Sequence, residues 1–279
     1  MKLHTLYREY QTTEVLEGSP YAFFFLFWFT KLLTLVQRKS EWFNNVSHKI
    51  YSSVSRSEFV IKNNGGVFVV QPFDDSTTIC ADYFERDIRD WLLTPAVKNV
   101  FVDIGANRGI YSIRAPQKYG YQTVHALEPN KEMFDVLARN IQLNNLEEIV
   151  TCHNLAAGKE TSTAHFSVDP MHKGGGKIVS ATDSDTFDVS VASLDTILQA
   201  FPAQEISFIK IDTEGFEFDV LAGMSVVLDG MTDGACIMIE TTELTKLVGK
   251  LAPFGFTYMK SQSADHLFIK KVNAVDYSS

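Results

Sequence analysis

The sequence has few cysteines and no surplus of basic residues. Its three cysteines, Cys80, Cys152 and Cys236, lie far apart, and none forms a Cys-x-x-Cys pair. This excludes a cysteine zinc knuckle and fits a reducing compartment. The formal net charge is −9, whereas a nucleic-acid partner requires a clustered basic surface. We therefore expect a cytoplasmic protein that does not bind nucleic acid.

The chain also lacks an apolar run long enough to cross a bilayer. The densest stretch, Tyr21–Val36, is interrupted by polar residues and falls short of the ~20 residues that a transmembrane helix needs. Glu9, Glu14 and Glu17 precede it, which argues against a signal peptide. Apolar residues continue at helical spacing to Ile50, so we predict an amphipathic helix.

We assign residues 1–57 to an N-terminal helical extension and residues 58–279 to the main domain. The apolar face of the extension is expected to pack on that domain or on a second subunit, as in a homodimer. The alternative is peripheral membrane contact, with the lysines and arginines of the segment facing lipid headgroups.

Beyond the extension, strands alternate with helices, which predicts an α/β fold with a mostly parallel sheet. Two apolar runs predict buried strands, namely Lys98–Ile104 and Ile206–Ile211. Three further strands are predicted at Gln122–Leu127, Ile149–Leu155 and Ala235–Ile239. Helices are expected at Asp82–Leu93, from about Gly109, at Lys131–Leu143, and through Val220, Leu221 and Val227. Hairpins are expected around Asn63-Asn-Gly-Gly66 and from Phe256–Lys260 and Leu267–Lys270.

The glycine-rich stretch Asp103-Ile-Gly105-Ala-Asn107-Arg-Gly109 follows the first buried strand. Glycines at such a turn let the backbone approach a ligand closely. Glu128 ends the next strand, where a carboxylate is placed to accept hydrogen bonds from both hydroxyls of a ribose. The spacing is not Gly-x-Gly-x-x-Gly, which disfavours a dinucleotide. The pattern therefore predicts a nucleoside cofactor, and it resembles motif I of S-adenosylmethionine (SAM) methyltransferases.

Acidic residues follow four of the predicted strands, at Asp103, Glu128, Asp212 and Glu240. Parallel strands bring their carboxyl ends to one edge of a sheet, where ligands bind. We therefore expect these carboxylates to converge beside the glycine loop.

Two half-buried strands, Thr163–Val168 and Phe187–Ala192, are expected on either side of Asp169–Ser184. That segment contains Lys173-Gly-Gly-Gly-Lys177, which lacks the Ser or Thr of a phosphate loop. We interpret it as a flexible lid over the site, with a plain disordered loop as the alternative. A metal cluster is conceivable near this segment, from His165, Asp169 and His172. Ordinary surface positions are the commoner explanation for such residues.

Four blocks together resemble the FkbM-type methyltransferase family: Asp103–Gly109, Glu128-Pro-Asn130, Asn154-Leu-Ala-Ala-Gly158 and Ile209-Lys-Ile-Asp-Thr-Glu-Gly-Phe-Glu217. The resemblance covers about Glu58–Lys271 and implies a class I Rossmann-like fold with a mostly parallel seven-stranded sheet. It implies SAM as cofactor and a small-molecule acceptor, commonly the hydroxyl of a sugar or natural product. Arg108 departs from the pattern, because an apolar residue is usual there.

The resemblance and the loop pattern together give a set of expected cofactor-binding residues. They are Glu85, Asp103, Gly105, Ala106, Asn107, Gly109, Glu128, Pro129, Asn130, Asn154, Ala156 and Asp212.

Methyl transfer to a hydroxyl requires a positioned acceptor and removal of its proton. Glu214 and Asp212 are the leading candidates for the base, and Glu217 is expected to orient a neighbour or to start a helix. Glu240 completes the expected catalytic set. Asp212 and Glu240 could instead hold a divalent cation that acidifies the hydroxyl, although we predict no metal. A further alternative is a catalytically silent SAM-fold scaffold.

Overall fold

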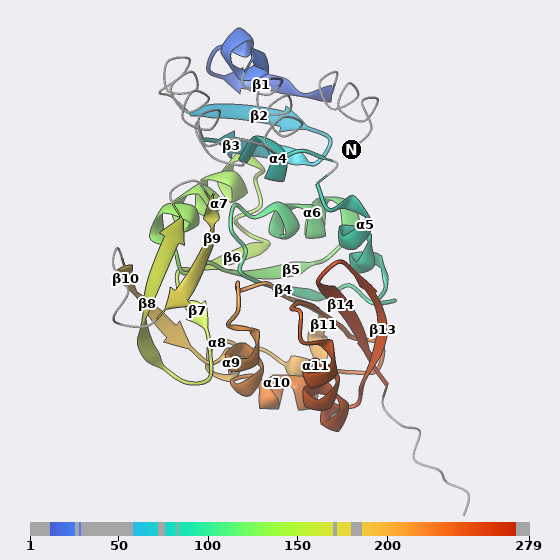
Figure 1. The fold of residues 1–279 in the computed structure, drawn as a ribbon. Coiled ribbons are helices and arrows are strands. Elements are labelled where there is room, and N and C mark those ends of the chain that lie inside the picture. The colour runs from blue at the N-terminus through green and yellow to red at the C-terminus, as the bar shows by residue number, and fades with distance from the viewer. Residues whose placement is uncertain are drawn as a thin grey trace, which may run out of the picture. The chain divides into compact units, whose positions relative to one another are not determined.

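A computed structural model describes residues 12–25, 28, 58–71, 76–82, 84–169, 172–179 and 186–271. It divides into two compact units (Figure 1), one drawn from Met1–Arg86 and Pro170–His172 and the other from Asp87–Asp169 and Lys173–Ser279. The predicted helix across residues 21–50 falls largely outside the described residues. The predicted domain boundary after residue 57 stays a prediction.

The first unit is built around a small antiparallel sheet in the order β1-β2-β3. Its elements are β1 (Glu14–Glu17), β2 (Phe59–Asn63), β3 (Gly66–Val70) and the short helix α4 (Ser76–Ile79). The predicted hairpin is confirmed, because Asn63 pairs with Gly66 across the turn. The Asn63 side chain closes the turn, accepting from Gly65 N–H at 2.8 Å and donating to the Cys80 carbonyl at 2.9 Å.

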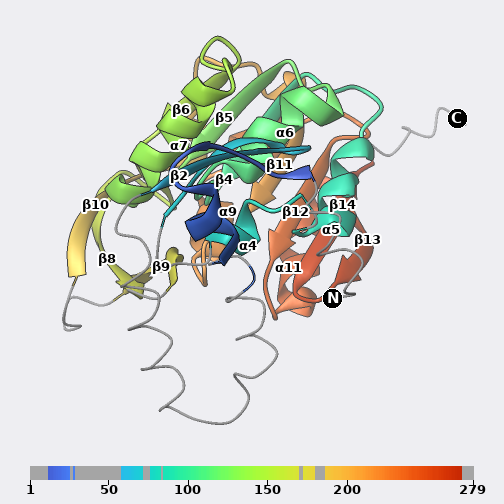
Figure 2. The same ribbon diagram turned by 90° about the horizontal axis from the view of Figure 1, so that it is seen from above.

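The second unit is organised around a seven-stranded sheet in the order β13-β14-β12-β11-β4-β5-β6 (Figures 1 and 2). Five neighbouring strands are parallel, and β14 runs antiparallel to both of its neighbours. The order reverses direction next to β4, the point at which such sheets bind ligands. The strands are β4 (Val100–Ile104), β5 (Thr123–Leu127), β6 (Val150–His153), β11 (Ile206–Ile211), β12 (Cys236–Glu240), β13 (Phe256–Gln262) and β14 (Asp265–Lys270).

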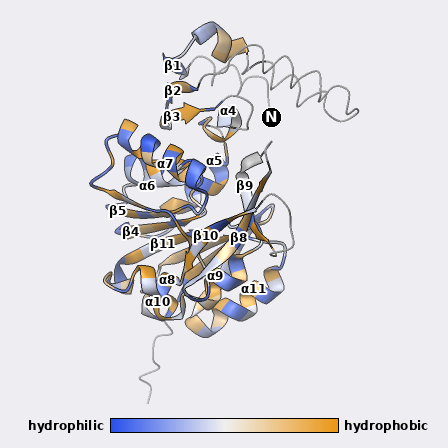
Figure 3. Ribbon diagram, turned by 90° about the vertical axis from the view of Figure 1, so that its left-hand side faces the viewer, coloured by the Kyte–Doolittle hydropathy of each residue, from blue (hydrophilic) through white to orange (hydrophobic). Residues whose placement is uncertain are grey.

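Helices cover both faces of this sheet. One face carries α6 (Ile110–Tyr119) and α7 (Lys131–Leu143), and the other carries α8–α11 (Figure 1). The outer helices mix hydrophilic and hydrophobic residues (Figure 3), as expected for helices that bury one stripe. The remaining helices are α5 (Arg86–Arg89), η1 (Asp90–Leu93), α8 (Leu194–Ile197), η2 (Ala203–Glu205), α9 (Glu217–Ala222), α10 (Ser225–Gly230), α11 (Leu244–Leu251) and η3 (Ala252–Phe254).

A continuous apolar core lies between the sheet and helices α8–α11. It joins alternate side chains of β4, β11 and β12 to residues such as Val220, Val227 and Leu247. Alternation along each strand leaves the other side chains on the α6 face, where Asp103 and Lys210 lie opposite each other in register. The charged side chains of β4 and β11 therefore lie on the α6 face, near the ends of these strands.

A second, four-stranded sheet overturns the interpretation of the glycine run as a lid. Residues His172–Val179 form the strand β9, which pairs with β8 (Ser162–Asp169) in the order β7-β10-β8-β9, with β7 (Ala156–Ala157) and β10 (Thr186–Ala192). A Cβ on Gly176 would lie 2.3 Å from the Phe166 ring. Glycine is therefore present because an aromatic side chain packs against the strand. Because glycines have no side chains, the sequence here does not show the polar–apolar alternation typical of a strand.

Two expected helices are shorter than predicted. The helix predicted from Asp82 begins at Arg86 and tightens into η1. The helix expected through Val227 is broken into α9 and α10 at Gly223. A Cβ on Gly223 would lie 1.9 Å from the carbonyl oxygen of Gly158, so a neighbouring backbone occupies that side of the chain.

Within the described ranges, no helix combines the length and hydrophobicity that crossing a bilayer requires.

Candidate active site

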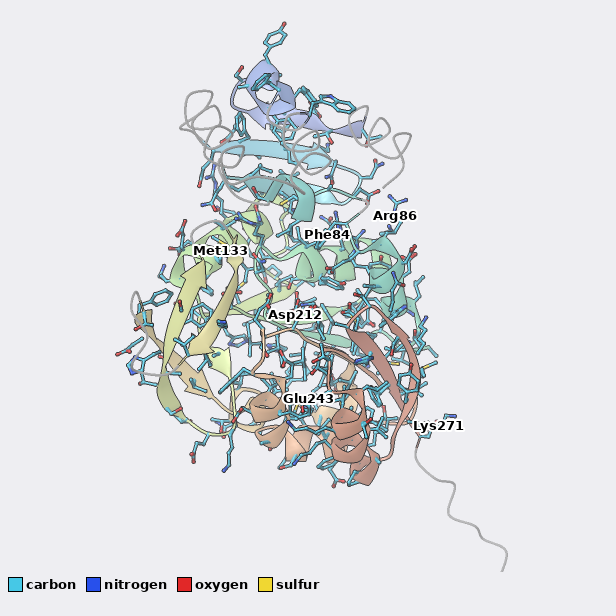
Figure 4. All side chains as sticks on the ribbon, in the orientation of Figure 1. Phe84, Arg86, Met133, Asp212, Glu243 and Lys271 are labelled. Atoms are coloured by element: carbon cyan, nitrogen blue, oxygen red, sulfur yellow. The ribbon has the colours of Figure 1, made fainter. Side chains whose placement is uncertain are left out.

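The predicted acidic residues do come together at one edge of the seven-stranded sheet. Asp103 lies within β4, Glu128 and Asp212 follow β5 and β11, and Glu240 ends β12. These strands are parallel neighbours, so their carboxyl ends share one rim. Figure 4 marks Asp212 at the end of β11, between the two helical layers.

The glycine loop after β4 is held tightly by the protein itself. Gly105 has φ +76°, and a Cβ there would lie 1.8 Å from the carbonyl oxygen of Asp212. Gly109 has φ +83°, and its Cβ would lie 2.5 Å from the side chain of Leu137. Both positions need glycine for its backbone conformation and for this close packing. Contacts within the protein therefore require these glycines even without a bound ligand.

Glu128 anchors the loop through its carboxylate. One oxygen accepts from Asn107 N–H and the other from Asn130 N–H, both at 2.9 Å. Burial raises the pKa of Glu128 to about 7, and the two backbone hydrogen bonds oppose the rise. Each carboxylate oxygen has two acceptor sites, so the side chain retains capacity for a further donor such as a ribose hydroxyl.

The segment after Glu128 is fixed by amide side chains. Asn154 donates to the carbonyls of Glu128 and Pro129 at 2.9 and 3.1 Å. Asn130 caps α7 by accepting from Glu132 N–H at 3.0 Å. Among the predicted cofactor-binding residues, Asn154 and Asn130 thus shape the turn, and direct ligand contact by them stays a prediction.

Asn107 gives the observation that bears most directly on a ligand. Its backbone lies in the left-handed region, with φ +51°. Its side-chain oxygen is buried, yet no hydrogen-bond donor reaches it within the described part of the chain. A buried acceptor without a partner costs free energy, and a donor on a bound molecule would remove that cost. The loop, its orphan acceptor and Glu128 therefore fit a nucleoside cofactor.

Asp103 is completely buried beneath the loop. It accepts from Ser112 Oγ at 2.6 Å, which ties β4 to α6. Burial raises its pKa, whereas the nearby charge of Lys210 lowers it. Asp103 therefore connects the strand before the loop to the helix after it. Its direct contact with a cofactor stays a prediction.

Asp212, Glu240 and Asp265 form a carboxylate cluster on adjacent strands. Glu240 lies opposite Asp265 in the pairing of β12 with β14. Partial burial, the charges of Asp212 and Asp265, and a hydrogen bond with Asp212 raise the pKa of Glu240 to about 8, against the opposing effect of Lys210. Asp265 was missed in the sequence, because only the antiparallel register of the last hairpin brings it here.

The other acidic residues of the β11 motif differ in role. Glu217 is buried at the start of α9, and its Oε1 accepts from Thr213 N–H, Thr213 Oγ1 and Gly215 N–H. This is the orienting and helix-starting role expected for it. Glu214 is exposed, and its φ is +55°, so its side chain lies on a strained turn next to the cluster.

The remaining predicted residues contribute backbone. Ala106 N–H and Gly105 N–H both donate to the Leu127 carbonyl, at 2.9 and 3.1 Å. Ala156 is buried in β7 and pairs with Val191 of β10. Glu85 falls in the first unit, with φ +47°, and its predicted contact with the cofactor stays a prediction.

Across the described residues, no three His, Cys, Asp or Glu side chains are arranged to hold a metal ion. His165, one member of the possible cluster, instead contacts Asp188 with 2.8 Å between Nδ1 and Oδ1. At the carboxylate cluster, the positive charge next to Asp212 is the ammonium of Lys210, at 2.9 Å.

The fold and site define a class of protein. Five parallel strands, an antiparallel hairpin at one edge and a glycine loop at the reversal of strand order are the class I SAM-methyltransferase arrangement that the sequence predicted. A family model described as a methyltransferase FkbM domain matches residues 103–254. The chain belongs to this family, as its motifs indicated.

Similar proteins carry methyltransferase names. The chain is 25% identical to Methyltransferase 1 of Beauveria bassiana, over 44% of this chain and 57% of that protein. It is 27% identical to the hexuronic acid methyltransferase AglP of Haloferax volcanii, over 59% of this chain and 66% of that protein. The alignments thus span less than two thirds of these relatives. The crystal structure of a methyltransferase FkbM from Methylobacillus flagellatus superposes with a TM-score of 0.45 at 17% identity, covering 70% of this chain and 52% of that one.

Proposed function

We propose that this protein is a SAM-dependent methyltransferase that methylates a hydroxyl of a sugar or another small natural product. The observation that carries the proposal is the carboxylate rim beside a glycine loop with an orphan buried acceptor. Membership of the FkbM family supports the transfer of a methyl group. The hexuronic acid methyltransferase among the relatives supports a sugar as acceptor.

Each part of the rim has its own task in this proposal. Glu128 binds the ribose hydroxyls, and Asn107 offers its buried side-chain oxygen to a donor of the cofactor. SAM, when bound, supplies an electrophilic methyl group on a sulfonium. The protein must then orient the acceptor hydroxyl and remove its proton.

We assign proton removal to the pair formed by Asp212 and Glu240. A general base works best when its pKa lies near the operating pH, and the pKa of Glu240 is raised to about 8. Motif spacing alone favours Glu214 together with Asp212. Glu240 and Glu214 are both exposed, so the choice rests on the raised pKa of Glu240 and its hydrogen bond with Asp212, and Glu214 remains the second candidate.

The function is tested with methyl-labelled SAM and a panel of sugars and small hydroxyl compounds. We expect S-adenosylhomocysteine (SAH) to form and the label to appear on an acceptor oxygen. Micromolar binding of SAM with no transfer to any hydroxyl of the panel would support the scaffold alternative.

The base is tested with three variants and an active acceptor. Glu240→Gln should keep SAM affinity and lose roughly 10²–10⁴-fold in turnover. Asp212→Asn should lose turnover to a similar extent, whereas Glu214→Gln should lose less than about tenfold. The reverse ranking would move the base to Glu214. Abolition of turnover by EDTA and its recovery with Mg²⁺ would support the metal-assisted alternative.

A further inference from the structure

Lys210 is a charged residue in the middle of a buried strand. All six residues of β11, Ile206–Ile211, are buried, and the other five are apolar or a serine. The side chain of Lys210 is only 5% exposed. Burying an ammonium is costly unless it is paired with opposite charge, so its neighbours explain why a lysine is tolerated here.

Those neighbours belong to four different parts of the site. The ammonium lies 2.9 Å from Asp212 Oδ2 at the end of β11 and 3.8 Å from Asp103 Oδ1 on β4. It also lies 3.5 Å from the carbonyl oxygen of Gly105 in the glycine loop. The ring of Tyr111 on α6 covers it, with 5.1 Å between Nζ and the ring centre.

We propose that Lys210 is the positioning residue of this site. Its ammonium joins the carboxylate of Asp212 to the carbonyl of Gly105, and so fixes the proton-accepting pair relative to the cofactor loop. Lys210 does not touch the reacting atoms in this proposal and acts through Asp212. Its catalytic consequence rests on the proposed function, whereas its electrostatic effect on the apo protein does not.

Several carboxylates lie near the ammonium of Lys210, so its positive charge affects their pKa values. Five carboxylates lie along neighbouring strand ends, and we call them the carboxylate row. They are Asp103, Asp212, Glu240, Asp265 and Glu128. Lys210 is a cation that acts on this row, opposing the rise of both the Asp103 and the Glu240 pKa. Without its charge, the row would take up protons more readily.

The matched control is Lys270, a second buried lysine on the same sheet. Its ammonium donates to the carbonyls of Leu228 and Asp229, at 2.7 and 2.8 Å. It is 5% exposed and lies at the opposite end of β14 from Asp265. Loss of this lysine removes a buried ammonium of similar depth without touching the carboxylate row.

The experiment titrates the apo protein by NMR with ¹³C-labelled glutamate carboxyls, and Glu240→Gln identifies the Glu240 signal. In Lys210→Met, the pKa of Glu240 should rise by roughly half a unit to one unit. It should return toward the wild-type value in Lys210→Arg and stay unchanged in Lys270→Met.

An unchanged Glu240 titration in folded Lys210→Met would overturn the proposal, as would an equal shift in Lys270→Met. If Lys210→Met does not fold, Lys210→Gln removes the charge while keeping a hydrogen-bond donor, and the same two outcomes decide. No step of this test uses SAM or an acceptor. Failure of the proposed function would instead appear as wild-type protein that does not bind SAM or transfer methyl.

Discussion

Cofactor affinity should depend on pH through Glu128. Its pKa is raised to about 7, so at pH 6 about nine tenths of the free protein carries the proton and at pH 8 about one tenth. Ribose hydroxyls donate hydrogen bonds, and a carboxylate accepts them more strongly than a carboxylic acid. If only the ionised form binds, affinity for SAH should rise about tenfold from pH 6 to pH 8.

Calorimetry of SAH binding at these two pH values measures the change in affinity. Repeating the titration at pH 6 in buffers of different ionisation enthalpy shows whether a proton is released on binding. Glu128→Gln cannot ionise, so its affinity should be weaker and nearly independent of pH. Glu128→Ala should weaken binding by about 2–4 kcal/mol. Glu240 titrates near pH 8, so the series is repeated in Glu240→Gln to remove its contribution.

Loop support must be separated from ribose binding. Glu128→Gln places an amide NH₂ against one of the two N–H donors that the carboxylate accepts from, Asn107 and Asn130. An unsatisfied buried donor costs about 1–3 kcal/mol, and each kcal/mol lowers Tm by about 2–4 °C for a domain of this size. Asn154→Ala is the control, because it loosens the same turn without altering the carboxylate. Equal wild-type affinity at pH 6 and pH 8 would refute the ribose assignment.

Three further predictions concern stability and the N-terminus. Gly105→Ala should prevent folding or lower the free energy of unfolding by several kcal/mol, because its Cβ would overlap the Asp212 carbonyl. Gly120 has φ +82° and open space around it, so Gly120→Ala should lower the free energy of unfolding by only about 1 kcal/mol. Denaturant titration measures both. The raised pKa of Glu240 means that the folded protein holds this proton more tightly than the unfolded chain. Its stabilising contribution is complete below about pH 4.5 and is lost as the pH rises through about 8. Glu240→Gln should therefore flatten the decline of Tm between pH 5 and pH 8, and an unchanged decline would contradict this account. The segment 21–50 should bury its apolar face against protein, so the full-length chain should stay in the supernatant with liposomes, and pelleting that only detergent reverses would favour membrane contact.

The strand-and-loop framework of the site was predictable from sequence. The run before Gly105 is apolar without alternation, as expected for a strand buried on both faces. Glu128 follows a second predicted strand, which alternates polar and apolar residues, so the meeting of both strand ends at one rim required only parallel pairing. Local pattern and global fold agree here, and the predictions for β4, β5 and α7 (Lys131–Leu143) were confirmed.

Long-range contacts set the limit of such prediction. The reason for Gly105 is the carbonyl of Asp212, which is distant in sequence. The β9 strand was misread because glycines show no alternation, and its pairing with β8 became visible only in three dimensions. Lys210 offered a signal that we did not use, since a lone charge within a buried strand requires a partner nearby.

The hydrogen bonds of Glu128 have a consequence for how the site meets its ligand. Its N–H donates to the His153 carbonyl, its own carbonyl accepts from Asn154, and its carboxylate receives two backbone N–H groups. One residue thus joins β5, β6, the glycine loop and the start of α7 without help from a bound molecule. Such a junction is preorganised, so binding has little chain entropy to remove. The cofactor pocket should accordingly exchange its amide hydrogens slowly even in the empty protein, and ligand should slow that exchange only slightly further.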